Sequence, residues 1–510
     1  MKTLFSTLLL TLLSLILPAC SSGSSDEPES PTTQLTLSTY GLSFLAEGGQ
    51  QSFTVSTNAK RLEVSTVHSW ITVKEVKSGT ANARQFEVTA QANTQESGRE
   101  GSVDVKADTQ GASIRITQAQ AAPQPPTPEP AKGLPAEMAA KMGMGWNLGN
   151  NLDAQNNGVS GETLWGNQPA TLATFQRVKA AGFKSVRIPV TWMGHIGAAP
   201  DYLIEEAWMK RVAEVVGYAK QCDLHAIINI HHDGADSKYW LNIKEAAKDA
   251  AKNQAIQAQL TALWRQIATR FKNEGEYLLF ENVNEIHDGG WGWGENRTDG
   301  GKQYQTLNGW HQTFVDAVRG VGGENSHRFL GIASYTTDPE LAVDGSLVLP
   351  KDVVADRLMV SVHYYAPYEF SQQAKYTEWG HTGAAAKKVA GYDEDYVQKV
   401  FAGLKKKFID ANIPVYIGEL GATHRSGSRE ESFRKYYMEY VCKAAKEYSL
   451  IPFYWDNGAT TSGQEGYGIL NHATGDWIHN GEEIATLMVR AVENNDASYT
   501  LQSVYNNAPQ

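Results

Sequence analysis

Residues 277–285 read YLLFENVNE, a short apolar run that ends in an amide and a carboxylate. Such a run, bounded by polar segments, is typical of a buried strand. Seven similar runs occur after residue 133, and amphipathic stretches with helical spacing separate them. Parallel strands need a crossover connection each time, so this alternation predicts an α/β fold, a (β/α)8 TIM barrel; a doubly wound sheet would usually need fewer strands. The eight runs are 142–148, 185–190, 225–231, 277–284, 329–334, 358–364, 414–419 and 452–456; the clearest helical stretches are 171–181, 206–221 and 430–448.

The carboxyl ends of the predicted strands carry polar and aromatic residues. Catalytic side chains of such barrels project from this end of the strands, and ionisable groups inside a barrel are costly without a purpose. Two long connections, 233–254 and 286–303, should lie on the same face. The residues at these ends are Trp146, Asn147, Arg187, His231, His232, Asp233, Asn284, Glu285, His363, Tyr364, Tyr365, Glu419, Trp455, Asp456 and Asn457.

Glu285 and Glu419 end the fourth and seventh runs, so they should face each other across the barrel mouth. Glycoside hydrolysis needs such a pair, one acid to protonate the leaving oxygen and one carboxylate to attack the anomeric carbon. Asn284 could hold the 2-hydroxyl of the sugar. Arg187 and Tyr365 could keep the nucleophile ionised while Glu285 holds its proton.

Eight motifs along residues 133–492 resemble glycoside hydrolase family 5, most closely its subfamily 4. The resemblance implies a retaining endo-β-1,4-glucanase, with Glu285 as acid/base, Glu419 as nucleophile and no cofactor. It implies supporting roles for Arg187, His231, Asn284, His363, Tyr365 and Trp455. The motifs are GWNLGN (145–150), ETLWGN (162–167), VRIPVTW (186–192), NIHHD (229–233), FENVNE (280–285), HYYAPY (363–368), IGELG (417–421) and WDNG (455–458).

The acid/base motif departs from many relatives, which continue with Pro-Arg where this chain has Ile286-His287-Asp288. The loop that follows places Trp291 and Trp293 among glycines, and aromatic faces of this kind can stack on a glucan chain. This form of the loop resembles xyloglucan-active members. The full set of candidate substrate contacts is Asn147, Trp165, Trp192, Trp291, Trp293 and Asp456.

Several alternatives remain at this stage. The same catalytic set serves several polysaccharide backbones, so mixed-linkage glucan, cellulose, mannan and xylan are alternatives to xyloglucan. A surface protein that binds glycan without cleaving it is the competing class. Adjacent His231 and His232 suggest a metal, but neighbours on a strand point to opposite faces, so we expect no metal site. Cys222 and Cys442 lack metal spacing and are expected to be buried free thiols.

The first residues predict export. Lys2 precedes an apolar run from Leu4 to Leu17, which is too short to span a membrane and is typical of a signal peptide. The run ends at Cys20 in a pattern that resembles a bacterial lipobox. We therefore expect a signal peptide over 1–19, lipidation of Cys20, a polar tether over 20–33 and a lipoprotein at the outer membrane, facing the cell surface.

A second domain is predicted between the tether and the barrel. Short alternating runs over 34–120 favour an all-β, immunoglobulin-like sandwich, and several of its motifs resemble the BACON domain of Bacteroidetes proteins. Trp70 and Tyr40 are its main aromatics, which favours a spacer over a glycan-binding module. Five prolines within 121–130 predict an extended linker over 121–132, and the catalytic domain then covers 133–510.

Bulk composition agrees with a polysaccharide partner. The 510-residue chain has a formal net charge of −11, which argues against nucleic acid. Its 13 Trp and 22 Tyr suit a neutral ligand that is bound by stacking, although a large aromatic core would also use them. We expect a monomer.

Overall fold

The computed structural model describes residues 33–80, 83–95, 97–120 and 131–510. The predicted signal peptide, Cys20, nearly all of the tether and residues 121–130 of the linker lie outside the described residues. The chain divides into two compact units, Met1–Gln124 and Pro125–Gln510. Among the described residues, no helix combines the length and the apolar character that crossing a membrane requires.

The first unit is an all-β sandwich, as the sequence predicts. Two four-stranded sheets, ordered β1-β3-β6-β5 and β2-β8-β7-β4, share one apolar core. Alternation places every second side chain inside; in β3, for example, Phe53 and Val55 are buried, and Phe53 stacks on Phe86 of β6. The strands are β1 (Leu35–Leu37), β2 (Gly41–Phe44), β3 (Gly49–Thr57), β4 (Leu62–Ser65), β5 (Ile71–Thr80), β6 (Ala83–Ala90), β7 (Arg99–Ala107) and β8 (Gln110–Gln118).

The second unit is a closed barrel of eight parallel strands, which confirms the predicted fold class. The ring runs β9-β12-β13-β14-β15-β16-β17-β18 and closes by pairing β18 with β9. Nearly all of the strand residues are buried, because helices cover the outer face of every strand. The strands are β9 (Gly145–Leu148), β12 (Ser185–Ile188), β13 (His225–Ile228), β14 (Leu278–Glu281), β15 (Leu330–Ala333), β16 (Leu358–Tyr364), β17 (Val415–Leu420) and β18 (Ile451–Asp456).

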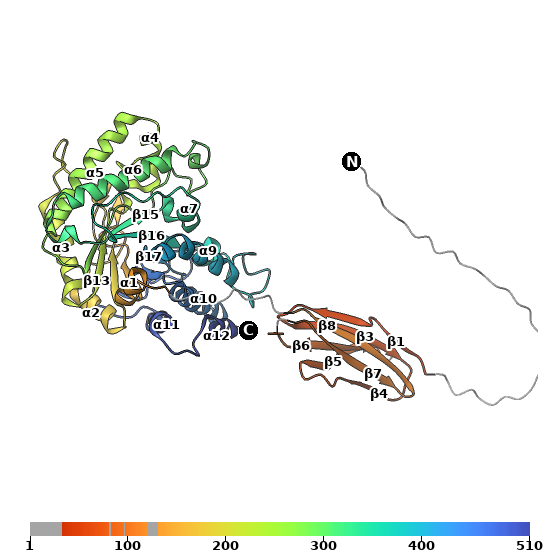
Figure 1. Cartoon of the computed structure of the whole chain (residues 1–510). Helices are drawn as coiled ribbons and strands as arrows, with labels where there is room; N and C mark the ends of the chain where they lie inside the picture. The colour runs from red at the N-terminus through yellow and green to blue at the C-terminus, as the bar shows by residue number, and fades with distance from the viewer. Residues whose placement is uncertain (1–32, 81–82, 96, 121–130) are drawn as a thin grey trace, which may run out of the picture. The chain divides into compact units, whose positions relative to one another are not determined.

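Helices follow each strand and lie outside the barrel (Figure 1). The larger ones present an apolar stripe to the strands; in α3, for example, Val212, Val215 and Val216 are buried. The α-helices are α1 (Leu134–Met142), α2 (Leu172–Ala180), α3 (Glu206–Gln221), α4 (Ile243–Ala246), α5 (Ala250–Arg270), α6 (Lys302–Arg319), α7 (Pro339–Val343), α8 (Tyr368–Ser371), α9 (Glu394–Lys407), α10 (Ser428–Glu447), α11 (Gly481–Glu493) and α12 (Leu501–Asn506). Short 3-10 helices lie at η1 (His232–Ser237), η2 (Glu295–Arg297), η3 (Gly323–Ser326), η4 (Tyr335–Thr337) and η5 (Ile409–Ala411), and a small hairpin joins β10 (Gln155–Asn156) to β11 (Val159–Ser160).

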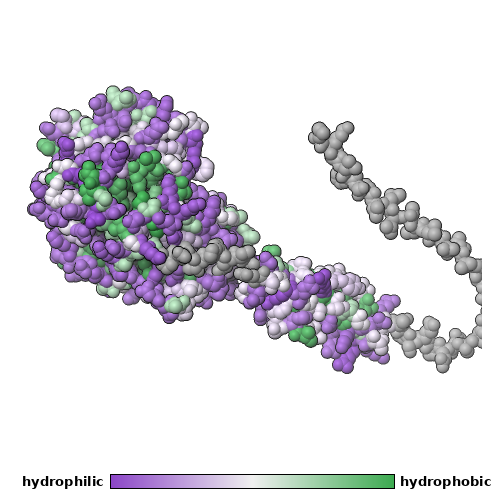
Figure 2. All heavy atoms as spheres, viewed as in Figure 1, coloured by the Kyte–Doolittle hydropathy of each residue, from purple (hydrophilic) through white to green (hydrophobic). Residues whose placement is uncertain are grey.

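Apolar packing closes the end of the barrel where the strands begin. Met138 and Met142 of α1 belong to one buried cluster with residues from the starts of the strands, including Phe453 and Met359. In the view of Figure 2, hydrophobic residues gather where Figure 1 labels β15, β16 and β17, within an otherwise largely polar face. Cys222 and Cys442, the cysteines within the described residues, are free; Cys442 is buried as predicted, whereas Cys222 is only partly buried.

Candidate active site

Arg187 of β12 lies at the centre of a buried polar network inside the barrel mouth. Its guanidinium donates to Glu281 Oε2 (2.9 Å) and to Glu419 Oε1 (2.8 Å). It also donates to Asn147 Oδ1 (3.1 Å) and to Asn284 Oδ1 (2.8 Å). Burial lowers the pKa of Arg187, but the two carboxylates outweigh it and raise that pKa above its ordinary value. The network therefore contains a fixed positive charge.

Glu281, the last residue of β14, is a member of this network that the sequence analysis did not single out. Its side chain is fully buried and accepts hydrogen bonds from Ser361 (2.7 Å), Tyr416 (2.8 Å) and Asn229 Nδ2 (2.8 Å), besides Arg187. Burial raises its pKa, but the charge of Arg187 and these hydrogen bonds lower it below the ordinary value. Its position at a strand end was the available signal, since a carboxylate there needs a partner.

Glu419 of β17 is held by two donors. Arg187 contacts Oε1, and the Tyr365 hydroxyl donates to Oε2 (3.1 Å). The pairing of β16 with β17 shifts register next to Gly418, so that His363 pairs with Glu419 directly after Val362 pairs with Ile417. An extra residue in one strand re-aims the side chain that follows it. This irregularity turns Glu419 toward the barrel mouth.

Glu285 lies four residues beyond the end of β14 and contacts His363, whose Nδ1 is 2.8 Å from Oε1 of Glu285. The same nitrogen is 3.5 Å from Oε2 of Glu419. Ligating atoms of all three side chains lie within 4.8 Å of one another. Paired carboxyls roughly 5–5.5 Å apart suit direct attack by one of them, whereas a separation of roughly 6.5–9.5 Å leaves room for a water molecule. The observed spacing fits direct attack.

The two carboxyls differ in pKa. Burial raises the pKa of Glu419 above its ordinary value, although the charges of His363 and Arg187 oppose the shift. Burial also raises the pKa of Glu285, but the hydrogen bond and charge of His363 outweigh it and lower that pKa. This order is the reverse of the sequence-based expectation.

Trp455 and His231 form the wall beside Glu419. Trp455 is the last residue but one of β18, and its ring lies parallel to the His231 ring, with centroids 5.9 Å apart. The Nε2 atom of His231 is 3.9 Å from Glu419 Oε1. Gly149 is required opposite, because a Cβ there would lie 2.7 Å from the Trp455 ring. The structure thus brings together all eight predicted catalytic and supporting residues.

Three predicted substrate contacts are wrong, because their side chains are fully buried. Asn147 donates to two backbone carbonyls below the site, Gly418 (2.8 Å) and Tyr454 (3.1 Å). The Trp192 indole packs in the core and donates to a backbone carbonyl. Asp456 accepts from the Trp146 indole (2.9 Å) and from backbone N–H groups of the following loop. These residues support the site and cannot touch a polysaccharide.

The other three predicted contacts are exposed. Trp165 is 39% exposed, Trp291 56% and Trp293 80%. The Trp291 ring lies over the ring of His287, which is two residues beyond Glu285, with 4.1 Å between centroids. The Arg297 guanidinium lies 4.8 Å from the centroid of the Trp293 ring. These are the exposed aromatic surfaces that the sequence analysis placed near the site.

Buried Asp288 holds the tryptophan-bearing loop in shape. It accepts the N–H of Gly290 (2.9 Å), the N–H of Asn296 (3.1 Å) and the amide of Gln303 (3.1 Å). Gly290 and Gly294 approach so closely that a Cβ on Gly290 would lie 2.4 Å from the Gly294 backbone. The two glycines therefore bring the ends of the loop together, and Trp291 and Trp293 lie between them.

The sequence analysis assumed that His231 and His232 lie on a strand and point to opposite faces, and this assumption is wrong. β13 ends before these residues, and their rings are not on opposite faces; their centroids are 4.4 Å apart. Asp153 supplies a third nearby group, although both of its oxygens accept backbone N–H groups. Two groups in the described residues have metal-like spacing: Asp153 with His231 and His232, and Glu285 with His363 and Glu419.

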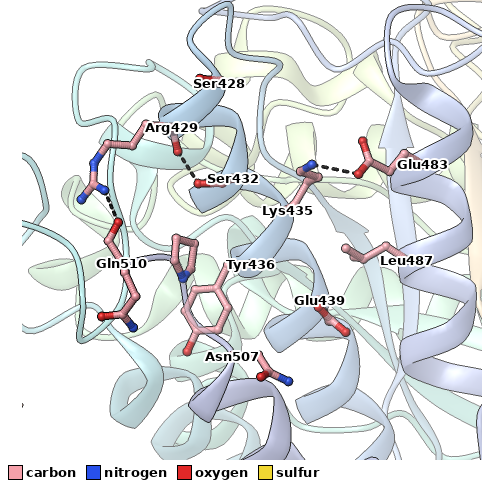
Figure 3. Close-up of a pocket in the computed structure, with 11 residues that line it drawn as sticks. Ser428, Arg429, Ser432, Lys435, Tyr436, Glu439, Glu483, Leu487, Asn507 and Gln510 are labelled. Carbon is pink, nitrogen blue, oxygen red and sulfur yellow. Dashed lines mark hydrogen bonds and ion pairs between the residues drawn. The ribbon is translucent and has the colours of Figure 1, made fainter. Parts of the chain in front are cut away.

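One cavity of about 630 Å³ lies elsewhere, among α10, α11 and the segment after α12 (Figure 3). Its charged groups are satisfied locally: Lys435 pairs with Glu483 (2.8 Å), and Arg429 donates to the backbone carbonyl of Gln510. It holds no carboxylate pair backed by a buried cation. The polar network at the strand ends is therefore the better candidate site.

Comparison with known proteins agrees with this geometry. The family model described as "Cellulase (glycosyl hydrolase family 5)" matches residues 149–461, and the BACON model matches residues 63–119. Endoglucanase A of Paenibacillus barcinonensis is 37% identical over 352 residues, covering 66% of this chain and 85% of that protein. A xyloglucan-specific endo-beta-1,4-glucanase of Bacteroides ovatus is 35% identical over 367 residues, covering 69% of each. The solved structure described as a GH5-4 broad specificity endoglucanase from Bacteroides salanitronis is 54% identical, with a TM-score of 0.70, covering 72% of this chain and 97% of that one.

The barrel and its paired carboxyls, together with these matches, define a glycoside hydrolase. The chain belongs to glycosyl hydrolase family 5, carries an N-terminal BACON domain, and has the endoglucanase activity on β-glucans of that family. The predicted family and fold are confirmed, and the matches indicate an enzyme rather than the non-catalytic alternative.

Proposed function

We propose that this enzyme is a retaining endo-β-1,4-glucanase in which Glu285 is the acid/base and Glu419 the nucleophile. The carrying observation is the placement of both carboxyls and His363 within 4.8 Å, with Arg187 and Tyr365 bound to Glu419. Both donors stabilise the ionised carboxylate. Glu285 is the more exposed of the two side chains, at 22% against 7%, as suits a group that must reach a leaving oxygen and later a water.

The proposed reaction has two steps. Glu285 protonates the glycosidic oxygen while a Glu419 oxygen attacks the anomeric carbon, which breaks the glycosidic bond and forms a glycosyl ester. Glu285, now ionised, takes a proton from a water molecule. The oxygen of that water attacks the anomeric carbon and breaks its bond to Glu419, which restores both glutamates. Asn284 accepts from Arg187 through Oδ1, so its Nδ2 can donate to the 2-hydroxyl of the sugar.

His363 is proposed to control the proton of the pair. Its Nδ1 lies between the two carboxyls, closer to Glu285 than to Glu419. Its hydrogen bond and charge act against burial on the pKa of Glu285, so His363 sets how readily Glu285 gives up its proton. The proposed active form has ionised Glu419 and protonated Glu285.

Xyloglucan is the proposed preferred substrate. The similar enzyme of Bacteroides ovatus is xyloglucan-specific, and Trp291 and Trp293 offer an exposed wall for a branched chain. A second candidate is broad specificity that includes mixed-linkage glucan, because the more similar protein from Bacteroides salanitronis is described as broad in specificity.

Reducing-end release by the purified protein on xyloglucan, mixed-linkage glucan, carboxymethyl cellulose, mannan and xylan tests the proposal. Glu419→Ala removes the nucleophile, and Glu483→Ala, which removes a carboxylate of a surface ion pair, is the matched control. We expect fastest release on xyloglucan, loss in Glu419→Ala and full activity in Glu483→Ala. Similar rates on several β-glucans favour the broad-specificity candidate. Activity that survives in Glu419→Ala would refute the assigned nucleophile.

The sandwich domain is proposed to be a spacer. Arg99 lies 4.4 Å from the Trp70 ring and covers it, whereas Tyr40 is an exposed single aromatic side chain. A glycan platform usually presents several aromatic faces. Deleting residues 34–130 should leave polysaccharide affinity unchanged; a clear loss of affinity would show a binding module instead.

Lipidation of Cys20 and display at the outer membrane are proposed from the lipobox-like sequence. Labelled fatty acid should enter the wild-type protein and not Cys20→Ala expressed in the same cells. Fractionation should place only the wild type with the outer membrane. Equal labelling of both proteins would contradict the anchor.

A further inference from the structure

Asn229, a buried residue just beyond the end of β13, makes three side-chain contacts that no assigned role explains. Its Oδ1 accepts the N–H of Val190 (3.1 Å). Its Nδ2 donates to Glu281 Oε2 (2.8 Å) and lies 3.1 Å from His231 Nδ1. A backbone N–H can only donate and a carboxylate can only accept, so these two partners fix the orientation of the amide. Both amide hydrogens then point at acceptors.

This orientation determines where His231 carries its proton. An amide N–H at 3.1 Å requires a lone pair on Nδ1, so the neutral ring is protonated on Nε2. Burial lowers the pKa of His231 well below its ordinary value, which is consistent with a neutral ring. The Nε2 atom is the one that faces the site, 3.9 Å from Glu419 Oε1.

The other tautomer would fail at both ends of the ring. An Nδ1–H would point at the Asn229 amide hydrogen, placing donor against donor. A lone pair on Nε2 would face Glu419 Oε1, placing acceptor against acceptor. The Asn229 amide is therefore bound to Glu281 of the buried network and also determines which nitrogen of His231 can donate a hydrogen bond beside Glu419.

We propose that Asn229 is a positioning residue of the proposed hydrolysis: it fixes His231 in the tautomer whose Nε2–H donates to a substrate oxygen bound beside Glu419. The inference rests on the proposed function of the site. It assigns no catalytic step to Asn229 itself, which touches neither substrate nor Glu419.

The chain contains a matched control. Asn282, one residue beyond β14, also places its Nδ2 against a buried histidine nitrogen, His311 Nδ1 (3.0 Å), while its Oδ1 accepts from Trp264 (3.1 Å). His311 Nε2 lies 2.9 Å from the Ala333 carbonyl, so this pair has the same chemistry outside the catalytic set. Asn229→Asp and Asn282→Asp therefore make the same change at two buried Asn–His pairs.

The experiment compares these two variants in the full chain. Aspartate in place of Asn229 offers His231 Nδ1 an acceptor, which draws the proton from Nε2 to Nδ1. We expect kcat on xyloglucan to fall about 100-fold in Asn229→Asp with a smaller change in KM, since losing a residue that fixes an imidazole tautomer lowers kcat strongly. Asn282→Asp should keep kcat within about twofold of wild type, because it lies outside the positioning network. Wild-type kcat in a folded Asn229→Asp overturns the proposal.

A direct measurement keeps the proposal testable if Asn229→Asp does not fold. Nitrogen-15 NMR of histidine-labelled wild-type protein, with His231→Gln to identify the resonance, reports which ring nitrogen is protonated. We expect protonated Nε2; a proton on Nδ1 overturns the inference. Failure of the proposed function appears separately, as wild-type protein without reducing-end release or as full activity in Glu419→Ala.

Discussion

The two ends of the barrel are built from the same eight strands but have opposite chemistry. Where the strands begin, Ile227 of β13 and Leu279 of β14 pack with α1 in a cluster of apolar side chains. Two to four residues further along the same segments, Asn229, Glu281 and His231 are equally buried but polar. The interior therefore changes from apolar to polar within two to four residues of each segment.

The difference shows how the fold separates stability from chemistry. Burying a charge costs several kcal/mol unless it is paired and hydrogen-bonded, so the polar end gains little net stability from its contacts. The apolar end stabilises by removing hydrocarbon from water. Substitutions at the two ends should therefore affect different measurements, and four experiments test that separation, from the largest expected effect to the smallest.

Glu285→Gln should change the polar end most. The amide keeps the shape of the side chain but cannot donate the proton, and general acid catalysis contributes roughly 10²–10⁴-fold to a rate. We expect kcat to fall by that factor, while the thermal midpoint stays equal or rises because a partly buried carboxyl is removed. Steady-state kinetics and calorimetry measure both. A large loss of stability would show that Glu285 is structural.

Phe453→Ala, at the apolar end, should lower the stability of the protein and leave its catalysis unchanged. Phe453 is fully buried in the cluster below the barrel, and truncating a buried phenylalanine costs about 3–5 kcal/mol. Urea denaturation should show this loss, with kcat per folded molecule unchanged. A fall in kcat without a fall in stability would contradict the separation of the two ends.

His363→Ala should move the pH dependence of kcat/KM. The His363 charge lowers the pKa of Glu285 and opposes the rise in that of Glu419, so its removal raises both. The acidic limb requires ionised Glu419 and the basic limb protonated Glu285, so both limbs should move to higher pH, together with a lower maximum. His225→Asn, at the start of β13, should leave the limbs in place. Limbs that move to lower pH would contradict the proposed protonation states.

Trp293→Ala tests the exposed loop and should have the smallest effect. One lost stacking face is worth roughly 1 kcal/mol, which corresponds to about a fivefold rise in KM for xyloglucan. kcat should remain near that of wild type. Tyr40→Ala removes an exposed aromatic from the sandwich and should change neither parameter. Equal KM values in both variants would exclude the loop from substrate binding.

The sequence predicted the contents of the polar end better than their orientation. Strand-end position identified Arg187, Glu285 and Glu419 because charged groups there need a reason to be buried. It could not show that Trp192 and Asp456 are fully enclosed, since exposure depends on packing between distant segments. These two residues were therefore assigned to substrate in error.

Two other features depended on backbone detail that sequence patterns lack. The alternation rule failed at His231 and His232 because β13 ends at Ile228, and His231 has φ −95° and ψ −83°, which is not strand geometry. Asn229 and Glu281 lie inside motifs that the sequence analysis recognised. Their contacts with His231 and with each other, which the sequence does not show, are what identify them as part of the network.

The buried Arg187–Glu281 pair also has a consequence for how the chain assembles. The pair joins β12 to β14 across β13, with a guanidinium–carboxylate contact of 2.8 Å and no exposure of either side chain. Sliding one strand by a single residue would turn its charge to the other face and leave the partner unpaired in the interior. Such a misaligned barrel would carry a penalty of several kcal/mol, so the ion pair selects the correct strand register during folding.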